Sequence, residues 1–289
     1  MINIGLQVRR AVAEDYQQIA NLLFYEANAH RHLDWRSPLE WIGSLNYWVL
    51  EENGRIIAAL ACPVDPPQVA WIRLFGYDPH LSASEAWSAL WNTAHGEVLR
   101  VDPHTQITSI VVKQWFQTLL ISSGFELKQN IVLLQLMNEN IRSFSAPRNF
   151  QIRPMQENDL SAVTKVDLAA FGWFWHNTQD SLKRARLQAV RAAVAEDESG
   201  VIGYQLSTGN VLGAHLARLG VSPEAQGRGV GTALVDDLIR SLGMSQTSRL
   251  SVNTQSDNVS SLALYKKMGF VRTGECFPVL VYPTNKGIQ

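Results

Sequence analysis

One loop and one imidazole in the second half of the chain are the groups best suited to chemistry. The loop places three glycines within five residues and reads Gln226-Gly227-Arg228-Gly229-Val230-Gly231. Glycine weakens helices and strands because it loses the most backbone freedom on folding, so the cluster indicates a close approach to the backbone. His215 lies eleven residues before Gln226. An imidazole with the ordinary pKa of about 6.5 is mostly neutral at pH 7 and can accept a proton.

The elements on either side of the loop determine what it can hold. Residues 213–221 are expected to form a strand, and Val230, Leu234, Leu238 and Leu242 recur at helical spacing. The first amides of a helix are unpaired and carry the positive end of its dipole, so a strand, a glycine turn and a helix form a cradle for an anion. The loop lacks both Gly-Lys-Ser/Thr and Gly-x-Gly-x-x-Gly, which excludes two common nucleotide motifs. Alone, it fits either a phosphate site or a tight turn.

Two motifs resemble those of one superfamily. Gln-x-x-Gly-x-Gly, formed by Gln226, Gly229 and Gly231, is similar to the loop that binds the pyrophosphate of acetyl-CoA in GNAT N-acyltransferases. Residues 258–274 resemble the second CoA motif of that superfamily, with matches at Asn258, Tyr265, Gly269 and Phe270. Ser261 departs from the pattern, in which alanine is common there. The order of elements expected across residues 150–285 also resembles the GNAT order.

This resemblance implies a set of acetyl-CoA contacts. The loop and the start of its helix would bind the phosphates, and backbone N–H groups at the end of the preceding strand would hold the pantetheine and the carbonyl. Arg228 either adds charge to the phosphates or is a solvated loop residue, and Asn253 is a weaker candidate than Asn258. The implied cofactor-binding residues are Leu219, Gly220, Val221, Gln226, Gly227, Arg228, Gly229, Val230, Gly231, Thr232, Asn253, Asn258 and Tyr265. No metal is implied.

Acyl transfer from a thioester to an amine needs a neutral amine and a protonated leaving group. An alkyl ammonium has a pKa of about 10, so freeing its lone pair at pH 7 costs about 4 kcal/mol. His215 lies where the histone-acetylating branch carries its glutamate base, and strand alternation predicts that it shares a face with Ala217, Leu219 and Val221. Tyr265 occupies the position from which GNAT enzymes protonate the departing thiolate. The alternatives are a structural histidine satisfied by its neighbours and a tyrosine that caps the core.

Residues 171–178, FGWFWHNT, are the candidate acceptor wall. In GNAT enzymes the region after the first helix lines the acceptor pocket, which implies substrate-pocket roles for Trp173, Phe174, Trp175 and His176. The rings suit an apolar or cationic group, and His176 is a second candidate base. The alternative is a hydrophobic plug packed against the first domain. His30, His32 and Asp34 lack further nearby ligands, which argues against a metal site.

The chain also repeats itself at an offset of 144, and a period this long indicates a duplicated domain. The aligned pairs include Val8 with Ile152, Arg9 with Arg153 and Asp15 with Asp159. A second match, between residues 122–130 and 267–275, lies near the end of each half. The predicted organisation is a degenerate GNAT-like domain at 1–140, a linker at 141–149 and a catalytic GNAT domain at 150–289. The offset places Ser82, Glu85 and Trp87 opposite Gln226, Gly229 and Gly231, so we expect no working CoA site in the first domain.

Each half reads as the same series of elements. In the second half, strands are predicted at 150–153, 190–197, 201–208, 213–221, 249–254, 270–275 and 277–283, with helices at 157–171, 230–242 and 259–268. In the first half, Asn53-Gly54 is a strong hairpin signal. The predicted fold class is α/β (α+β), with two GNAT-like domains that each have a mixed, mostly antiparallel central sheet flanked by helices.

Composition narrows the class of protein. The chain has 289 residues, of which 46% are hydrophobic and 18% charged, a composition typical of a globular protein. Its net charge of −1 gives no electrostatic support for a nucleic acid or a membrane as partner. The two cysteines cannot make a disulfide framework, and no apolar run approaches 18 residues, so a cytoplasmic protein is expected.

These observations predict an acetyl-CoA-dependent N-acetyltransferase that acts by direct attack of a primary amine, with its active site in the C-terminal domain. The acceptor is expected to be a small-molecule amine or a peptide. One alternative is an acyl-CoA-binding, sensing or partner-binding protein without turnover, and another is a protein N-terminal or lysine acetyltransferase. Fusion of two such domains can mimic a GNAT homodimer, so a monomer or weak homodimer is expected. The sequence leaves open the acceptor, the acyl-chain length and the role of the first domain.

Overall fold

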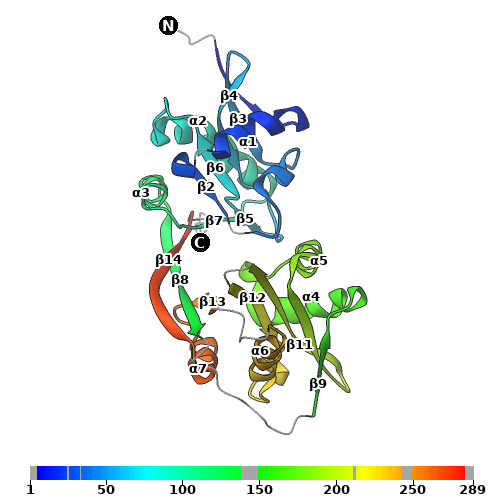
Figure 1. Ribbon diagram of the computed structural model, residues 1–289. Helices are drawn as coiled ribbons and strands as arrows, with labels where there is room; N and C mark the ends of the chain where they lie inside the picture. The colour runs from blue at the N-terminus through cyan, green and yellow to red at the C-terminus, as the bar shows by residue number, and fades with distance from the viewer. Residues whose placement is uncertain are drawn as a thin grey trace, which may run out of the picture. The chain divides into compact units, whose positions relative to one another are not determined.

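Figure 1 shows the two compact units of the computed structural model, which describes residues 5–24, 26–32, 34–137, 149–210, 213–242 and 249–283. Unit 1 comprises Met1–Lys128 and Pro278–Gln289, and unit 2 comprises Gln129–Phe277. The expected linker at 141–149 lies outside the described residues except for Asn149.

The strands of unit 2 belong to a nine-stranded mixed sheet, and its pairs from β9 to β8 are antiparallel except β12 with β13. The strands in spatial order are β9 (Gln151–Pro154), β10 (Arg191–Asp197), β11 (Gly200–Asn210), β12 (Gly213–Val221), β13 (Arg249–Gln255) and the second part of β8 (Glu126–Met137). The helices are α4 (Leu160–Trp175), α5 (Gln179–Gln188), α6 (Val230–Ser241) and α7 (Val259–Met268). The predicted fold class is confirmed for this unit.

Helices cover both faces of this sheet. Asp167 of α4 contacts Tyr204 of β11 on one face, whereas Val230 and Leu234 of α6 lie against Gly203 on the other. The helix expected at 157–171 is displaced toward the C-terminus, because the first three of these residues form a short 3₁₀ turn. Helix α5 was not predicted, since its residues are mostly polar and only Leu182 and Ala185 are buried.

Unit 1 has the same kind of architecture. Its antiparallel sheet has the order β1 (Leu6–Arg10), β3 (Tyr47–Glu52), β4 (Arg55–Ala61), β6 (Leu74–Tyr77) and β2 (Ala29–Arg31). A second group of strands pairs β5 (Val69–Trp71) with β7 (Gln106–Ile110) and β7 with the end of β14 (Val271–Val281). The helices are α1 (Tyr16–Phe24), α2 (Ala83–Val101) and α3 (Gln114–Ser122). The predicted hairpin turn is present, with φ of 50° at Asn53 and 80° at Gly54.

The duplicated motif near the start of each half forms the same ion-pair cluster twice. In unit 1, Arg9 contacts Asp15 at 2.7 Å and Glu51 at 2.7 Å. In unit 2, Arg153 contacts Asp159 and Glu196 at the same two distances. The aspartate accepts a backbone N–H in both cases, from Val12 and Gln156. Residues matched by sequence similarity therefore have the same structural role in both units.

The second repeated motif, residues 122–130 and 267–275, also has the same backbone structure in both units. Gly124 and Gly269 end equivalent helices with φ of 88° and 97°, a conformation that favours glycine. The residues that follow, Phe125 and Phe270, are both buried and donate their N–H groups to the carbonyls of Leu120 and Tyr265. Leu120 is thus the structural counterpart of Tyr265.

The last strand of each half continues into the other compact unit. Strand β8 begins in unit 1 and pairs with β13 in unit 2, whereas β14 begins in unit 2 and pairs with β7 in unit 1. The prediction of two strands at 270–275 and 277–283 is wrong, because β14 is one continuous strand. We retain 1–140 and 150–289 as the proposed boundaries of the duplicated sequence, while the compact units differ from them by this exchange.

Candidate active site

The structure requires glycine at the three loop positions for two different reasons. Gly227 and Gly229 have φ of 77° and 82°, which an L-residue adopts only with strain, and a Cβ at either would meet nothing within 4 Å. Gly231 lies inside α6, where a Cβ would come within 3.1 Å of Leu264. The loop therefore needs glycine for its conformation and for the packing of α6 on α7, and the space in front of the first two glycines is open.

The N-terminus of α6 is suited to an anion. Gly229 is the N-cap residue and supplies no side-chain cap, so among the described residues no side chain satisfies the amides of Val230, Gly231 and Thr232. Helix α2 of unit 1 begins differently, because the hydroxyl of Ser82 accepts the N–H of Glu85 and the carboxylate of Glu85 accepts the N–H of Ser82 in a capping box. This contrast supports a phosphate site in unit 2 and none at α2.

The two polar side chains of the loop are occupied within the protein. Arg228 forms a 2.7 Å ion pair with Asp197 and also contacts Asn149 at 3.3 Å. Hydrogen bonds from Ser199 and Arg228 lower the pKa of Asp197 to about 2. Gln226 donates its side-chain amide to the carbonyl of Val221 at 3.3 Å. Arg228 thus anchors the loop to the β10–β11 turn, and Gln226 joins it to the end of β12.

Strands β12 and β13 part next to this loop. They pair only from Ala214 with Leu250 to Leu216 with Val252, although β12 continues to Val221 and β13 to Gln255. Within these two fully described strands, the later residues of β12 have no ladder partner in β13. The free edge of β12 therefore offers main-chain groups to an extended ligand.

A bulge interrupts β12 at the same point. Strand β11 pairs Leu206 with Arg218 and Ser207 with Leu216, so Ala217 is an extra residue without an opposite partner. An extra residue reverses the alternation of side chains for the rest of the strand. The residues after Ala217 therefore point to the opposite face from the one on which regular alternation would place them.

This bulge overturns one sequence prediction. His215 does not share a face with Leu219 and Val221, because these two pack against the core beneath α6. His215, Arg218 and Gly220 pair with alternate residues of β11, namely Thr208, Leu206 and Tyr204, so they share the face covered by α4. Strand alternation alone misplaces His215 relative to the expected CoA contacts.

His215 is held by a serine on the neighbouring strand. Its Nδ1 lies 2.9 Å from the hydroxyl of Ser251, its register partner in β13, and that hydroxyl also contacts the carbonyl of Ala214 at 3.4 Å. When Ser251 donates to Ala214, it accepts from Nδ1 and leaves Nε2 as a proton acceptor. Burial lowers the pKa of His215 from its ordinary value of 6.5, so the ring is neutral at pH 7.

Tyr265 lies on the opposite face of the sheet. It is 4% exposed within the hydrophobic core that α6 and α7 cover, with its ring 5.4 Å from Phe270. Burial raises the pKa of its phenol, so the hydroxyl stays protonated and keeps a proton to donate. Asn258 is the N-cap of α7 and accepts the N–H of Ser261 at 3.1 Å, which gives it a structural role. Asn253 is exposed on the face of His215 and Ser251.

The candidate acceptor wall leaves helical geometry at Gly172, where φ is 70° and ψ is 177°. Trp173 is 49% exposed, Phe174 is buried and Trp175 is partly buried, and the ring of Phe174 packs edge-on against both tryptophans. His176 donates Nδ1–H to the carbonyl of Trp173 at 2.9 Å, because a carbonyl can only accept. This leaves Nε2 of His176 as an acceptor.

Sequence reasoning missed a buried polar cluster on the same face. Asp167 of α4 accepts hydrogen bonds from Tyr204 and, at 2.8 and 3.0 Å, from Arg218. The available signal was a single charged residue in each of two apolar runs, Asp167 in residues 166–175 (VDLAAFGWFW) and Arg218 in the strand GAHLARLGV. Two isolated opposite charges in segments that must be buried indicate a buried pair.

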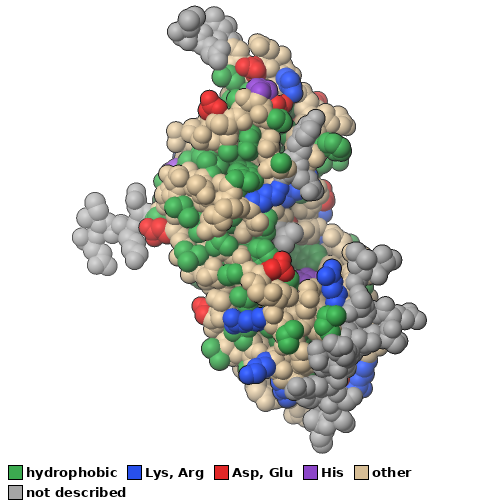
Figure 2. All heavy atoms as spheres, turned by 60° about the vertical axis from the view of Figure 1, so that its left-hand side comes forward, with side chains coloured by type: hydrophobic (Ala, Val, Ile, Leu, Met, Phe, Trp, Pro, Cys, Tyr) green, Lys and Arg blue, Asp and Glu red, His purple; other side chains and the backbone are tan. Residues whose placement is uncertain are grey.

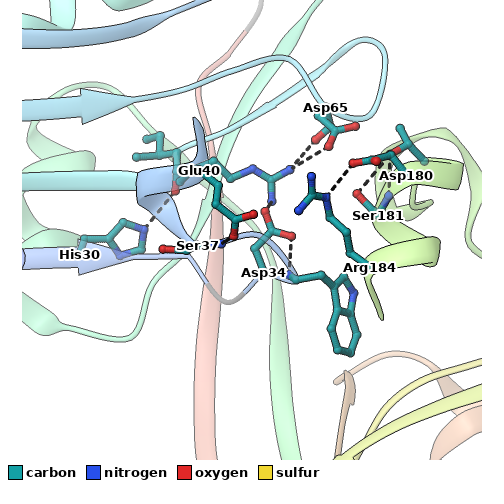
Figure 3. Close-up of polar contacts among 12 residues, drawn as sticks. His30, Asp34, Ser37, Glu40, Asp65, Asp180, Ser181 and Arg184 are labelled. Atoms are coloured by element: carbon teal, nitrogen blue, oxygen red, sulfur yellow. Dashed lines mark hydrogen bonds and ion pairs between the residues drawn. The ribbon is translucent and has the colours of Figure 1, made fainter. Parts of the chain in front are cut away.

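His30 is a buried histidine of unit 1, and it contacts the carbonyl of Ile72 at 3.3 Å (Figure 3). It also contacts the hydroxyl of Ser109 at 3.2 Å and stacks on Phe116. Burial lowers the pKa of His30 to about 3. His30 thus packs against Ile72, which follows β5, and against Ser109 of β7, and these contacts support the proposal that unit 1 does not bind CoA.

Arg73 centres another polar cluster of unit 1. Arg73 contacts Asp34 at 2.8 Å and lies 4.0 Å from Asp65, and both members of the closer pair are buried (Figure 3). No group of three or more His, Cys, Asp or Glu side chains in the part of the chain that the structure describes could hold a metal ion.

Charges of both signs occur over the face drawn in Figure 2, in agreement with the net charge of −1. No helix among the described segments is long and apolar enough to cross a membrane.

Comparison with known sequences agrees with this geometry. Residues 158–270 match the sequence model of the acetyltransferase (GNAT) family. The mycothiol acetyltransferase of Paenarthrobacter aurescens is 33% identical over 130 residues, which cover 39% of this chain and 40% of that protein. The peptidyl-lysine N-acetyltransferase YjaB of Salmonella typhimurium is 31% identical over 78 residues, or 27% of this chain and 48% of that protein. The chain therefore spans less than half the length of either relative.

Solved structures match over nearly the whole chain. A GCN5-related N-acetyltransferase from Sphaerobacter thermophilus aligns with a TM-score of 0.64 and 14% identity, covering 98% of this chain and 97% of that one. A tandem GNAT protein from the clavulanic acid biosynthesis pathway aligns with a TM-score of 0.62 and 16% identity, covering 96% and 98%. At these identities the likeness shows the fold, which is that of two GNAT-like domains in tandem.

Proposed function

Because residues 158–270 form a domain of the GNAT acetyltransferase family, we propose that this chain transfers an acetyl group from acetyl-CoA to a primary amine in unit 2. The observation that carries the proposal is the arrangement around the parted strands. A proton acceptor, His215, lies on one face, a proton donor, Tyr265, lies on the other, and an uncapped helix N-terminus stands beside them. Each component of acyl transfer has a residue suited to it.

The residues present fit acetyl-CoA. The open space before Gly227 and Gly229 and the unsatisfied amides of α6 would accept the diphosphate. The unpaired edge of β12, from Leu219 to Val221, would hold the pantetheine arm and donate to the carbonyl oxygen as negative charge develops there. When bound, acetyl-CoA supplies the activated acetyl group. Asn258, already engaged as a helix cap, would reach this ligand only through its remaining amide hydrogen.

His215 would accept the proton of the incoming ammonium group at Nε2, directly or through a water molecule. Its lowered pKa keeps the ring neutral at pH 7, and the contact with Ser251 fixes the orientation in which Nε2 is the acceptor. The amine must therefore approach from the face of the sheet that α4 covers. As the new C–N bond forms, the C–S bond breaks and the electron pair leaves with the sulfur.

Tyr265 would donate its phenolic proton to the departing sulfur from the opposite face. Its raised pKa keeps the hydroxyl protonated, and an aligned hydrogen bond rather than strong acidity drives the transfer. The attacking nitrogen loses its second proton as the amide forms, and the phenolate left on Tyr265 takes up this proton, directly or through water, which restores the protonated tyrosine.

We take a small-molecule amine as the acceptor, because a match to a mycothiol acetyltransferase covers 39% of the chain. The match to a peptidyl-lysine acetyltransferase is shorter, at 27% of the chain, and makes a peptide amine the second candidate. A protein that binds acyl-CoA without turnover would need the loop but neither His215 nor Tyr265.

The test is calorimetric titration with acetyl-CoA, followed by a free-thiol release screen over small amines, amino acids and peptides. We expect one equivalent to bind and thiol release to depend on an amine. Binding without release from any acceptor would favour the sensing alternative, and no binding would refute the assignment of the loop.

The His215→Gln variant is expected to lose the acidic limb of the pH–rate profile. Protonation of the imidazole stops it from accepting a proton, and burial lowers its pKa, so the wild-type limb should lie below pH 6.5. Because a water path can partly replace the imidazole, we expect about a tenfold loss of kcat at pH 7, less than a general base commonly contributes. Both kcat and kcat/KM are measured between pH 5 and pH 9.

His95→Gln is the matched control, because burial also lowers the pKa of His95, which lies in unit 1. It should leave the acidic limb in place. An unchanged limb in His215→Gln would assign that histidine to a structural role.

A further inference from the structure

We propose that Asp167 and Arg218 are positioning residues that hold the acceptor side of the site, by fixing residues 172–177 against the bulge of β12. This inference rests on the proposed function for the reaction that it supports. The acceptor side is the face of His215, since the base must reach the amine, and Asp167 and Arg218 lie on that face.

The ion pair of Asp167 with Arg218 is buried and bidentate. The side chain of Asp167 is 0% exposed and that of Arg218 is 14% exposed. Nε of Arg218 lies 2.8 Å from Oδ1 of Asp167, and the outer nitrogen lies 3.0 Å from Oδ2. The hydroxyl of Tyr204 donates to the same carboxylate. Such planar, two-point pairing sets an orientation as well as a distance.

The same two side chains hold the chain that follows the break at Gly172. Arg218 donates to the carbonyl of Trp175 at 2.7 Å, and Asp167 accepts the N–H of Asn177 at 2.6 Å. The guanidinium also lies 3.5 Å from the ring centre of Phe171, just before the break at Gly172. The path of the chain from 171 to 177 is therefore set by one ion pair.

The pair connects this segment to the reacting strand. Arg218 directly follows the bulged residue Ala217, and His215 lies two residues before that bulge on the same face. A change in the pair would move the aromatic segment that carries Trp173 and Trp175 relative to His215. Small errors in the alignment of reactants lower rates strongly.

The experiment compares Asp167→Asn, which keeps the shape and removes the charge, with Asp237→Asn. Asp237→Asn is the control, because it removes the charge from another bidentate ion pair of unit 2. This pair joins Arg191 of β10 to Asp237 of α6. We expect the acceptor KM of Asp167→Asn to rise about tenfold or more because of misalignment. The Kd for acetyl-CoA should stay within about twofold, since those contacts are separate. Asp237→Asn should change neither quantity.

A second readout does not need activity. Trp173 and Trp175 are the two tryptophans of the second half, so 5-fluorotryptophan labelling gives two ¹⁹F resonances there, assigned by single Trp→Phe changes. We expect both to shift or broaden in Asp167→Asn and to stay in place in Asp237→Asn. If Asp167→Asn does not fold, Tyr204→Phe removes the hydrogen bonds of the hydroxyl with Asp167 and Arg218 and keeps the ion pair, and it should cause smaller changes of the same kind.

Unchanged ¹⁹F resonances with unchanged acceptor KM would overturn the inference. Shifted resonances with an unchanged acceptor KM would also overturn it, because the segment would then not contact the acceptor. If the wild type transfers no acetyl group to any amine, the proposed function fails separately, and unmoved resonances would still refute the positioning of the segment.

Discussion

Gly229→Trp is expected to abolish detectable acetyl-CoA binding while the fold survives. The indole would occupy the open space before the first amides of α6, where we propose that the diphosphate binds. The φ of 82° at this position costs an L-residue about 1–2 kcal/mol, which a folded domain can tolerate. We expect the affinity to fall at least about 100-fold, or about 2.8 kcal/mol. Titration calorimetry measures the affinity, and thermal unfolding measures the fold.

Gly43→Trp is the matched control. Gly43 has a φ of 83°, and a Cβ there would meet nothing within 4 Å, as at Gly229, but it lies in unit 1. The two variants should lose similar stability, and only Gly229→Trp should lose acetyl-CoA binding. A Gly229→Trp protein that binds acetyl-CoA as tightly as the wild type would show that the ligand does not use this helix terminus.

Tyr265→Phe is expected to lower kcat by about 100-fold or more, because it removes the proton donor to the leaving sulfur. Affinity for acetyl-CoA should change by about twofold at most, since the ring remains in place. The fold should also survive, because Leu120 occupies the equivalent position in unit 1 without a hydroxyl and accepts the same backbone N–H. Steady-state thiol release measures kcat, and calorimetry measures the affinity.

The pH dependence adds a second check. Burial raises the pKa of Tyr265 above its ordinary value of 10, so ionisation of this group should cause no loss of kcat below pH 10. Tyr47→Phe is the control, because Tyr47 is a buried tyrosine of unit 1 whose pKa burial also raises. Equal kcat values for Tyr265→Phe and wild type would remove the proposed acid role.

The duplicated ion pairs show what a local pattern determines. Arg9 with Asp15 and Arg153 with Asp159 are six residues apart in each half, so one turn of chain brings them together and the repeat in sequence becomes a repeat in structure. The positive φ of Gly227 and Gly229 is likewise a property of the loop itself. The loop, the helix at 259–268 and most of the order of elements, α5 excepted, could therefore be predicted without the tertiary structure.

The positions of the catalytic candidates depended on strand pairing. The bulge at Ala217 exists only relative to β11, and it places His215 on the face opposite Leu219 and Val221. Periodicity assumes an unbroken strand, so it could not detect the reversal.

The sequence alone determined the GNAT resemblance, the duplication and the glycine loop, because each resides in short, contiguous segments. Only the tertiary structure decided that β8 and β14 cross between units and that Asp167 meets Arg218. These features join residues far apart in the chain, and the choice of partner depends on which surfaces the whole fold buries together.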